Sequence, residues 1–390
     1  MCRIAGFWDF SAQAAYPLEE TIVSMRDSLT YGGPDDAGFF IDKARRLAFG
    51  HRRLSIIDLS SQGRQPMSVD DGDISITFNG EIYNFALIRR ELEELGIRFR
   101  SASDTEVLLQ AYREWGLDFI GRWRGMWAFA LWNRRRQELI LCRDRVGVKP
   151  LFWYFRGGLF IFGSELKAFH RHPGFRGEIE REALPFYFQY GYTPTPMSIF
   201  KNTYKLEPGY FLIVDRTGKI RKEKYWDIED HFRRGAAERS RWLSRTDDEV
   251  ADELEEILTE GFKLRMVSDV PVGIFLSGGV DSSLLAALLR NGNSTPLKTF
   301  TIGFREESHN EAVWARKVAD HLGTEHTEFT CTPRDANFQG SSFLNTRLSS
   351  DHFPAPEESG EHRLSSAPVG GKIFRIRRHE LRASLLRSAS

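Results

Sequence analysis

The spacing of apolar residues changes once along this chain, and that change limits the folds the sequence can adopt. Up to about residue 226 the sequence has short strand candidates separated by turns, three of which span residues 73–78, 138–142 and 158–162. From residue 246 onward, helix and strand candidates alternate, with helices at 246–266, 284–290 and 310–322 and strands at 270–276, 297–303 and 326–331. Alternation of this kind is typical of a parallel sheet, so the sequence predicts a strand-rich α+β domain followed by an α/β domain.

A charged segment poor in aliphatic side chains, residues 227–245, lies between the two patterns and is predicted to be a linker. The length of 390 residues also fits two domains of ordinary size. Ser103 and Glu106 have the spacing of a capping box, and so do Thr246 and Glu249. We therefore expect a helix to begin at each of these two positions.

Composition excludes several classes of function. The 54 Lys and Arg residues balance 54 Asp and Glu residues, so the chain lacks the broad positive charge expected of a protein that binds nucleic acid or an anionic membrane surface. No apolar run approaches the roughly 20 residues of a membrane span, and the first one is interrupted at Asp9, too early for a signal peptide. Three widely separated cysteines fit a reducing compartment. We expect a cytoplasmic protein with no nucleic-acid or membrane partner.

Cys2 is the first candidate for chemistry. Removal of Met1 would expose its α-amine, whose pKa of about 7.7–8.0 suits a base that takes the proton of the adjacent thiol. Taken alone, Cys2 is more simply interpreted as a small residue beside the start codon.

Three further positions each have two interpretations. Asn79-Gly80 can form a tight hairpin turn, or its side-chain amide and backbone N–H can form an oxyanion hole. Asp104 can complement the positive end of its helix or bind a substrate ammonium group. Arg53 can be a surface charge or can bind a substrate carboxylate.

The second unit contains a glycine-rich loop, Ser277-Gly-Gly-Val-Asp-Ser-Ser283, between a predicted buried strand and a helix. Glycines let backbone N–H groups approach an anion, and the helix amino terminus adds positive potential. Asp281 could hold Mg²⁺ on bound phosphates, although a purely structural turn is the alternative. Because the loop lacks the lysine of a Walker A motif, γ-phosphate transfer is not indicated.

The motifs of the first unit occur in a definite order: Cys2-x-Ile-Ala-Gly6, Gly33-Pro-Asp-Asp36, His51-Arg-Arg-Leu-Ser-Ile-Ile-Asp58, Gln65-Pro-Met67, Asn79-Gly-Glu-Ile-Tyr-Asn84, Ser103-Asp-Thr-Glu106 and Arg143-Asp-Arg-x-Gly-x-Lys-Pro-Leu151. With them, residues 2–226 resemble the glutaminase domain of class II, amino-terminal-nucleophile (Ntn-hydrolase-type) glutamine amidotransferases, in the asparagine synthetase branch. The resemblance implies a four-layer αββα fold. It implies Cys2 as the nucleophile on the glutamine amide, with Asn79 and Gly80 as the oxyanion hole. It further implies that Arg53 binds the glutamine α-carboxylate, while Glu81 and Asp104 contact its amino end.

In the second unit, Ser277–Ser283 resembles the pyrophosphate loop of N-type ATP pyrophosphatases, and residues 299–304 and 310–324 resemble the asparagine synthetase domain. This resemblance implies ATP-binding residues in two groups: Phe275, Leu276 and Ile302 against the nucleotide, and Ser277, Gly278, Gly279, Asp281 and Ser282 near the pyrophosphate. It also implies Mg²⁺ at Asp281, glutamine, aspartate and ATP as substrates, and a homodimer.

The sequence departs from the family in two places. Gly32 stands where the family usually has the arginine of His-Arg-Gly-Pro-Asp. Beyond about residue 333 no family motif continues, and the Ser-, Arg-, Pro- and Gly-rich residues 334–390 are predicted to be a disordered tail, as a truncated or frameshifted reading frame would produce. The predicted organisation is therefore a glutaminase domain at 2–226, the linker, a partial ATP-pyrophosphatase domain at 246–333, and the tail.

These observations predict a glutamine-dependent asparagine synthetase. In that reaction Cys2 releases ammonia from glutamine, and the synthetase domain activates aspartate with ATP as β-aspartyl-AMP for amidation. We expect the glutaminase reaction, with net synthesis limited by the partial second domain. Two alternatives stay open: an amidotransferase acting on another carboxylate, and a catalytically inactive binding or regulatory protein.

Overall fold

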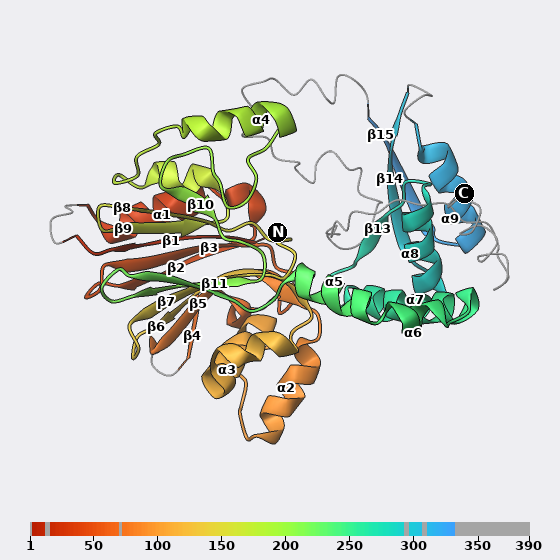
Figure 1. The fold of residues 1–390 in the computed structure, drawn as a ribbon, viewed down its shortest axis with the longest axis horizontal. Helices are drawn as coiled ribbons and strands as arrows, with labels where there is room; N and C mark the ends of the chain where they lie inside the picture. The colour runs from red at the N-terminus through yellow and green to blue at the C-terminus, as the bar shows by residue number, and fades with distance from the viewer. Residues whose placement is uncertain (1, 12–15, 70–71, 292–295, 306–309, 332–390) are drawn as a thin grey trace. The chain divides into compact units, whose positions relative to one another are not determined.

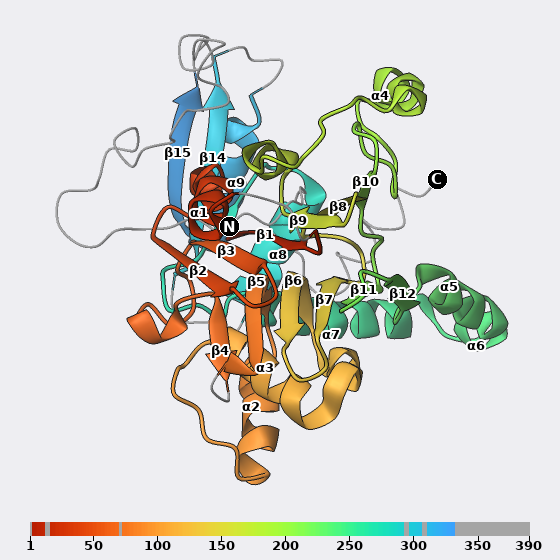
Figure 2. The same cartoon turned by 90° about the vertical axis from the view of Figure 1, so that its left-hand side faces the viewer.

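The computed structural model describes residues 2–11, 16–69, 72–291, 296–305 and 310–331. The contacts divide the chain into two compact units, Met1–Gly235 and Ala236–Ser390, whose elements are labelled in Figures 1 and 2. The predicted tail at 334–390 lies outside the described residues. None of the helices in the described residues combines the length and the apolar character needed to cross a membrane.

The described part of the first unit contains two six-stranded sheets in which every neighbouring pair of strands is antiparallel. The first sheet has the spatial order β10 (Thr203–Lys205), β8 (Phe152–Arg156), β9 (Leu159–Gly163), β1 (Arg3–Asp9), β3 (Leu47–Arg53), β2 (Asp36–Asp42). The second has the order β12 (Ile220–Lys224), β11 (Tyr210–Asp215), β7 (Glu138–Arg143), β6 (Gly125–Asn133), β5 (Ile74–Ile82), β4 (Met67–Val69).

Helices cover the outer face of each sheet (Figure 1). Helix α1 (Leu18–Asp27) packs on the first sheet, and α2 (Phe85–Glu94) and α3 (Asp104–Trp115) lie on the side of the second. Further helices in the described part of this unit are α4 (Leu184–Tyr190) and the short 3-10 helices η1 (Thr30–Gly32), η2 (Ser61–Gly63), η4 (Gly116–Arg122), η5 (Leu166–Arg171) and η6 (Arg181–Ala183).

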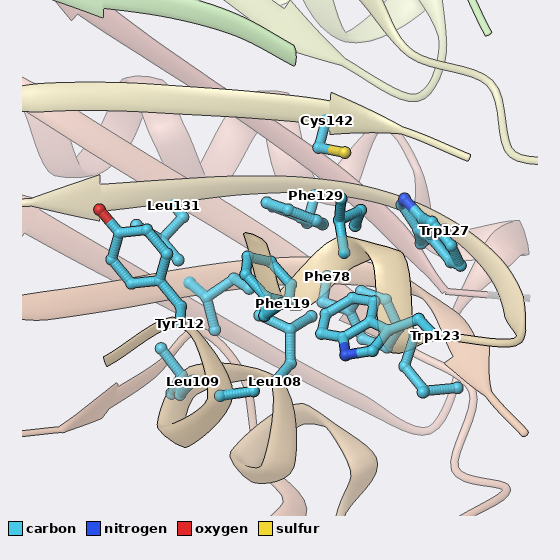
Figure 3. Close-up of a cluster of buried hydrophobic side chains, with 14 of the residues drawn as sticks. Phe78, Leu108, Leu109, Tyr112, Phe119, Trp123, Trp127, Phe129, Leu131 and Cys142 are labelled. Carbon is cyan, nitrogen blue, oxygen red and sulfur yellow. The ribbon is translucent and has the colours of Figure 1, made fainter. Parts of the chain in front are cut away.

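Three apolar cores hold these layers together. The core between the sheets includes Trp8, Phe49 and Trp132, and the core between the first sheet and α1 includes Phe7 and Ile22. Figure 3 shows the third core, in which side chains of β5, β6 and α3 meet those of η4. Alternation along each strand sends successive side chains into different cores. The predicted four-layer αββα fold is confirmed.

One interpretation of Asn79-Gly80 is wrong, and the helix predicted to begin after Ser103 does begin there, with a different cap. Asn79-Gly80 does not turn the chain, because both residues lie inside β5 and pair with β6. Ser103 does cap α3, accepting a hydrogen bond from the Thr105 N–H at 3.1 Å, but Glu106 does not complete a capping box. The Glu106 carboxylate instead accepts from the backbone N–H groups of the turn before the helix, at Arg100 and Ser101.

The second unit has a three-stranded parallel sheet among its described residues, in the order β13 (Gly273–Phe275), β14 (Lys298–Phe304), β15 (Glu325–Cys331). Its described helices include α7 (Asp247–Leu264), α8 (Val280–Arg290) and α9 (Ala312–Leu322). Thr246 forms the predicted capping box with Glu249 at the start of α7. The predicted partial parallel α/β sheet is confirmed.

Two exposed helices, α5 (Ile228–Ala237) and α6 (Arg239–Leu243), occupy most of the segment predicted to be a linker. Neither helix has a buried residue. The boundary between the two units falls within α5.

Candidate active site

A pocket in the first unit is lined by all six residues that the sequence associates with glutamine: Cys2, Arg53, Asn79, Gly80, Glu81 and Asp104. They reach it from four places, namely the residue before β1, the end of β3, the middle of β5 and the first position of α3. The strands bring together residues that are as much as 102 positions apart in sequence.

Cys2 is held at the edge of this pocket by its backbone and its sulfur. Arg3 donates from Nη1 to the Cys2 carbonyl oxygen at 3.1 Å and pairs through Nε with Glu165 at 2.5 Å. The Cys2 Sγ lies 3.3 Å from the Leu54 nitrogen, which donates to it, and 3.5 Å from the Leu54 oxygen. Burial raises the pKa of the Cys2 thiol, and the Leu54 N–H opposes that rise. Ionisation of this thiol therefore depends on nearby positive charge and on a base.

Asn79 presents an unpaired amide to the same pocket. Its side chain is fully buried, and neither Oδ1 nor Nδ2 has a hydrogen-bond partner within the described part of the chain. A buried polar group without a partner costs about 1–3 kcal/mol. A ligand oxygen placed beside Cys2 would satisfy the Nδ2–H donor, which is the function of an oxyanion hole.

The Gly80 N–H is directed to the same open edge of β5. The Phe78 N–H donates to Gln65 Oε1 at 2.8 Å and the Ile82 N–H donates to Asp104 Oδ2 at 3.0 Å, so these two groups point away from β6. Hydrogen-bonding groups alternate between the two edges of a strand, and the β5–β6 register is continuous, so the Gly80 N–H points the same way. It can therefore act with the Asn79 amide as a second donor.

At two positions in the pocket, neighbouring atoms lie so close to the backbone that only glycine fits. A Cβ at Gly80 would lie 2.3 Å from the Met126 carbonyl oxygen, within the β5–β6 pairing. A Cβ at Gly63 would lie 2.2 Å from Nη2 of Arg53. Any larger residue at either position would displace a donor that faces the pocket or the strand that carries it.

Arg53 is buried, and its guanidinium is fixed by backbone carbonyls of the segment that follows β3. It donates to the oxygens of Ile57 (3.1 Å), Ser60 (3.2 Å) and Asp58. Within the described residues these bonds use three of the five N–H donors of a guanidinium. A fixed positive charge in the pocket suits recognition of a substrate carboxylate.

Glu81 and Asp104 form an acidic part of the pocket. Burial, together with the nearby Glu81 charge, raises the pKa of Asp104 from 3.8 to about 7, although the Ile82 N–H opposes the rise. Burial also raises the pKa of Glu81, with Lys149 acting in the opposite direction. Because a bound cation would favour the ionised form of both carboxyl groups, this part of the pocket suits a substrate ammonium group.

Lys149 is a pocket residue to which the sequence analysis gave no role. Lys149 lines the pocket although only 2% of the residue is exposed. The residue does lie in one of the ordered motifs, Arg143–Leu151, and that membership was the only signal in the sequence.

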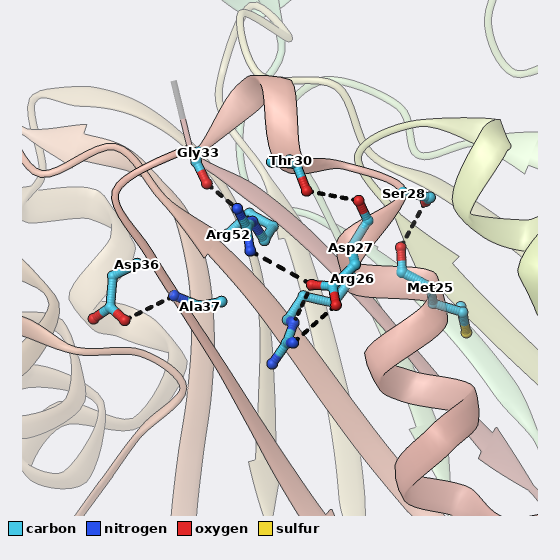
Figure 4. Close-up of polar contacts among 9 residues, drawn as sticks. All are labelled: Met25, Arg26, Asp27, Ser28, Thr30, Gly33, Asp36, Ala37 and Arg52. Carbon is cyan, nitrogen blue, oxygen red and sulfur yellow. Dashed lines mark hydrogen bonds and ion pairs between the residues drawn. The ribbon is translucent and has the colours of Figure 1, made fainter. Parts of the chain in front are cut away.

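Gly32, the departure from the family pattern, lies in η1 and is buried. Figure 4 shows that Arg52 binds nearby, donating to the Gly33 carbonyl oxygen at 3.0 Å and to Asp27 Oδ1 at 3.4 Å. Arg53, in contrast, is the one arginine in the described lining of the pocket. Arg52 therefore does not bring to the pocket lining the positive charge of the family arginine that Gly32 replaces.

The glycine-rich loop of the second unit joins the carboxyl end of β13 to α8. The Ser277 N–H donates to Ser282 Oγ at 3.1 Å, and Gly278 has a φ of 75°, with room for no side chain because a Cβ would lie 2.5 Å from Cβ of Trp314. Gly279 is the N-cap of α8 and no side chain caps this end. The first N–H groups of α8 therefore remain suited to an anion.

The other predicted ATP-binding residues lie on the neighbouring strand ends. Leu276 is buried, Phe275 is half-buried and Ile302 is 49% exposed. Asp281 is exposed in the first turn of α8, and no cluster of three metal-ligating side chains occurs in the described residues. One carboxylate beside an anion-binding loop is a donor set that fits Mg²⁺, which usually retains waters and binds one or two carboxylates together with phosphates.

Comparison with known proteins identifies the class of this chain. Residues 1–226 match the glutamine amidotransferase domain family, and residues 253–338 match the asparagine synthase family. The chain belongs to the glutamine amidotransferase family. Its combination of domains is that of the glutamine-hydrolysing asparagine synthetases.

Curated relatives agree with this placement. A putative glutamine-hydrolysing asparagine synthetase 2 of Methanocaldococcus jannaschii is 35% identical over 355 residues, covering 86% of this chain and 66% of the relative. Asparagine synthetase 3 of Bacillus subtilis is 34% identical over 352 residues, covering 86% of this chain and 55% of the relative. The amidase chry2 of Gibberella zeae is 31% identical over 391 residues, covering 94% and 56%. The chain thus spans about half to two thirds of the length of these relatives.

Proposed function

We propose that the first unit is a glutaminase in which Cys2 is the nucleophile, in a protein of the glutamine-dependent asparagine synthetase type. The observation that carries this proposal is the pocket that joins Cys2 to an unpaired buried amide at Asn79. The other pocket groups match the three parts of glutamine: a fixed cation at Arg53, a pair of carboxyl groups at Glu81 and Asp104, and two oxyanion donors.

The reaction follows from these positions. After Met1 is removed, the α-amine of Cys2 takes the thiol proton, and the sulfur forms a bond to the amide carbon of glutamine. Asn79 and the Gly80 N–H stabilise the negative oxygen of the tetrahedral intermediate. The C–N bond then breaks, and the ammonium form of the α-amine returns the proton to the departing NH2 group, which leaves as ammonia. Water attacks the thioester, which releases glutamate and restores the thiol.

We further propose that the second unit binds ATP and Mg²⁺ and, in the full-length relatives, activates aspartate as β-aspartyl-AMP. Support comes from the family match and from the uncapped amino end of α8 beside Asp281. We propose domain boundaries of 2–226 and 246–333, which the two family matches support, and a homodimer as the resemblance implies. No disulfide bond joins Cys2, Cys142 or Cys331 in the described part of the chain, which fits a reducing, cytoplasmic location.

Glutamate release from glutamine tests the glutaminase proposal. The full chain, with removal of Met1 established by mass spectrometry, is compared with Cys2→Ala. We expect the parent to release glutamate and the variant to show none above background. Hydrolysis that survives Cys2→Ala would refute the assignment of the nucleophile, and no hydrolysis in the parent would favour an inactive binding protein. Cys142→Ala is the matched control, because this second cysteine lies in an apolar core away from the pocket lining.

A second candidate is amidation of a carboxylate other than aspartate. The fungal relatives favour it, since two of them carry the name amidase, chry2 of Gibberella zeae and chyE of Penicillium rubens. Pyrophosphate release is measured with Mg-ATP and a panel of carboxylic acids that includes aspartate. Release with aspartate alone supports the asparagine synthetase assignment, whereas release with another acid alone supports this second candidate.

A further inference from the structure

Lys149 is a buried cation in the same pocket as Cys2, and the reaction steps given above do not use it. Only 2% of the residue is exposed. Removing a lysine ammonium group from water is costly unless other charges or hydrogen bonds compensate. Glu81 and the Cys2 thiol, both pocket groups, are among those that favour its charged form, so the lysine charge acts on the groups proposed to bind and attack the substrate.

The loop that presents Lys149 is fixed by the two charged residues at its start. The Asp144 carboxylate accepts three hydrogen bonds of 2.9–3.2 Å from backbone N–H groups of the loop, those of Val146, Val148 and Lys149. The Arg143 guanidinium donates to the carbonyl oxygens of Lys149 at 2.9 Å and Gly147 at 2.8 Å. Because both its N–H and its carbonyl oxygen are hydrogen-bonded, the backbone of Lys149, from which the side chain extends, is fixed.

The charged groups around Lys149 come from several elements. Glu81 from β5 and the Cys2 thiol favour its charged form, as does Asp144 of its own loop, while Arg3 from β1 opposes it. Burial is the largest effect and lowers the pKa of Lys149. Conversely, burial raises the pKa of Cys2, and the Leu54 N–H, the charge of the amino terminus, Lys149 and Arg53 oppose that rise, in that order. The amino terminus also favours the ionised form of Glu81, and Glu81 in turn disfavours the ionisation of Asp104, the other carboxyl group in the described pocket lining.

We propose that Lys149 is a positioning residue of the glutaminase site, whose ammonium group provides positive potential at the Cys2 sulfur and keeps Glu81 ionised to receive the amino end of glutamine. Arg53 also opposes the rise of the Cys2 pKa, but backbone carbonyls fix its guanidinium, so it cannot move to replace the Lys149 charge. This inference rests on the proposed function, since it assigns Lys149 a role through the proposed nucleophile.

Alkylation of Cys2 tests the proposal without requiring glutamine. The rate of iodoacetamide addition to the amino-terminal peptide of the full chain, lacking Met1, is followed by mass spectrometry from pH 5.5 to 10. Because a neighbouring positive charge typically lowers a thiol pKa by about one unit or more, Lys149→Met should move the midpoint of the rate–pH profile upward by about one unit. Below the midpoint, alkylation should be roughly tenfold slower than in the parent.

Two variants complete the alkylation experiment. Lys149→Arg should keep the parent midpoint of the rate–pH profile, because arginine retains the positive charge. Lys167→Met is the matched control: this lysine pairs with Glu165, the partner of Arg3, but is half-exposed and does not line the pocket, so its loss should leave the midpoint unchanged. If Lys149→Met does not fold by tryptophan fluorescence, Lys149→Gln is measured in its place.

The outcomes separate this inference from the proposed function. A folded Lys149→Met or Lys149→Gln protein with the parent midpoint, or an equal shift in the Lys167→Met control, would overturn the role of Lys149. A shifted midpoint in a chain whose parent releases no glutamate would refute the glutaminase proposal while leaving the charge effect on Cys2 established. In an active parent, we expect Lys149→Met to lower kcat and raise the pH of half-maximal kcat/KM, whereas Lys149→Arg restores both.

Discussion

Replacing Asp104 with asparagine should make the protein more stable at neutral and alkaline pH while weakening glutamine binding. Burial beside Glu81 raises the pKa of Asp104 from 3.8 to about 7. A group whose pKa is raised on folding contributes stability that is fully present below its unfolded pKa and is lost as the pH rises through its folded pKa. The buried carboxylate therefore destabilises the empty protein most above pH 7.

The size of the effect follows from the two pKa values. The raised pKa of Asp104 should lower the unfolding free energy by about 4 kcal/mol at pH 8, about 1.5 kcal/mol at pH 5 and about 0.5 kcal/mol at pH 4. Asparagine avoids this cost, and its oxygen can still accept the hydrogen bond from the Ile82 N–H. For a domain of this size, 1 kcal/mol corresponds to about 2–4 °C in Tm, so Asp104→Asn should raise the Tm by roughly 10 °C at pH 8.

Thermal unfolding of the full chain from pH 4 to 8, followed by tryptophan fluorescence, measures this difference. The signal reports mainly on the first unit, because seven of the nine tryptophans precede residue 236. Asp58→Asn is the matched control: its hydrogen bonds with Ser60 and the Ala102 N–H hold the pKa of that carboxyl below its usual value, so its loss should lower the Tm at pH 8. A Tm difference for Asp104→Asn that is independent of pH, or a lower Tm at pH 8, would refute the reasoning.

Three further substitutions test the site and the fold. Asn79→Ala should lower kcat for glutamate release by about 10²–10³-fold with little change in KM, because its amide binds the oxyanion rather than the substrate; a change in KM alone would contradict that role. Gly80→Ala should reduce the unfolding free energy by about 1–3 kcal/mol in urea titrations, since its Cβ would lie 2.3 Å from the Met126 oxygen; unchanged stability would show that β5 and β6 can separate. Thr246→Ala removes the capping box of α7 and should cost about 1 kcal/mol, detected as faster amide exchange in the first turn of that helix; unchanged exchange would argue that the cap does not hold it.

The parts of the fold that the sequence predicts best are those set by local periodicity. The strand predicted at 138–142 is observed at Glu138–Arg143, and Thr246 begins a helix as its capping spacing indicates. Asn79-Gly80 shows the limit of this reasoning. Its local preference for a turn is overridden by continuous pairing with β6. In the sequence β6 is only an apolar segment some distance along the chain, and nothing in the local pattern shows that it pairs with Asn79-Gly80.

The site was predictable in its members but not in its geometry. Motif order and family resemblance indicate Cys2, Arg53 and Asp104, yet no pattern in the residues places them in one pocket. The pocket depends on two sheets packing face to face and on the open edge of β5 beyond its short pairing with β4. Lys149 could not be assigned a role from the sequence, because a lysine in a loop is usually solvated and only packing reveals its burial.

The three carbonyl bonds of Arg53 also affect how the pocket recognises ligands. An unrestrained arginine loses rotamer freedom when it binds a carboxylate, at a cost of about 0.5–1.5 kcal/mol. Here that entropy is lost when the segment after β3 folds around the guanidinium, so binding need not order it again. Because these carbonyls set the position of the guanidinium, the backbone of residues 57–60 also determines which ligands Arg53 can bind. A shift toward a longer or shorter substrate would have to remodel residues 57–60 together with Arg53, so specificity at this end of the pocket should change by segment rather than by single side chain.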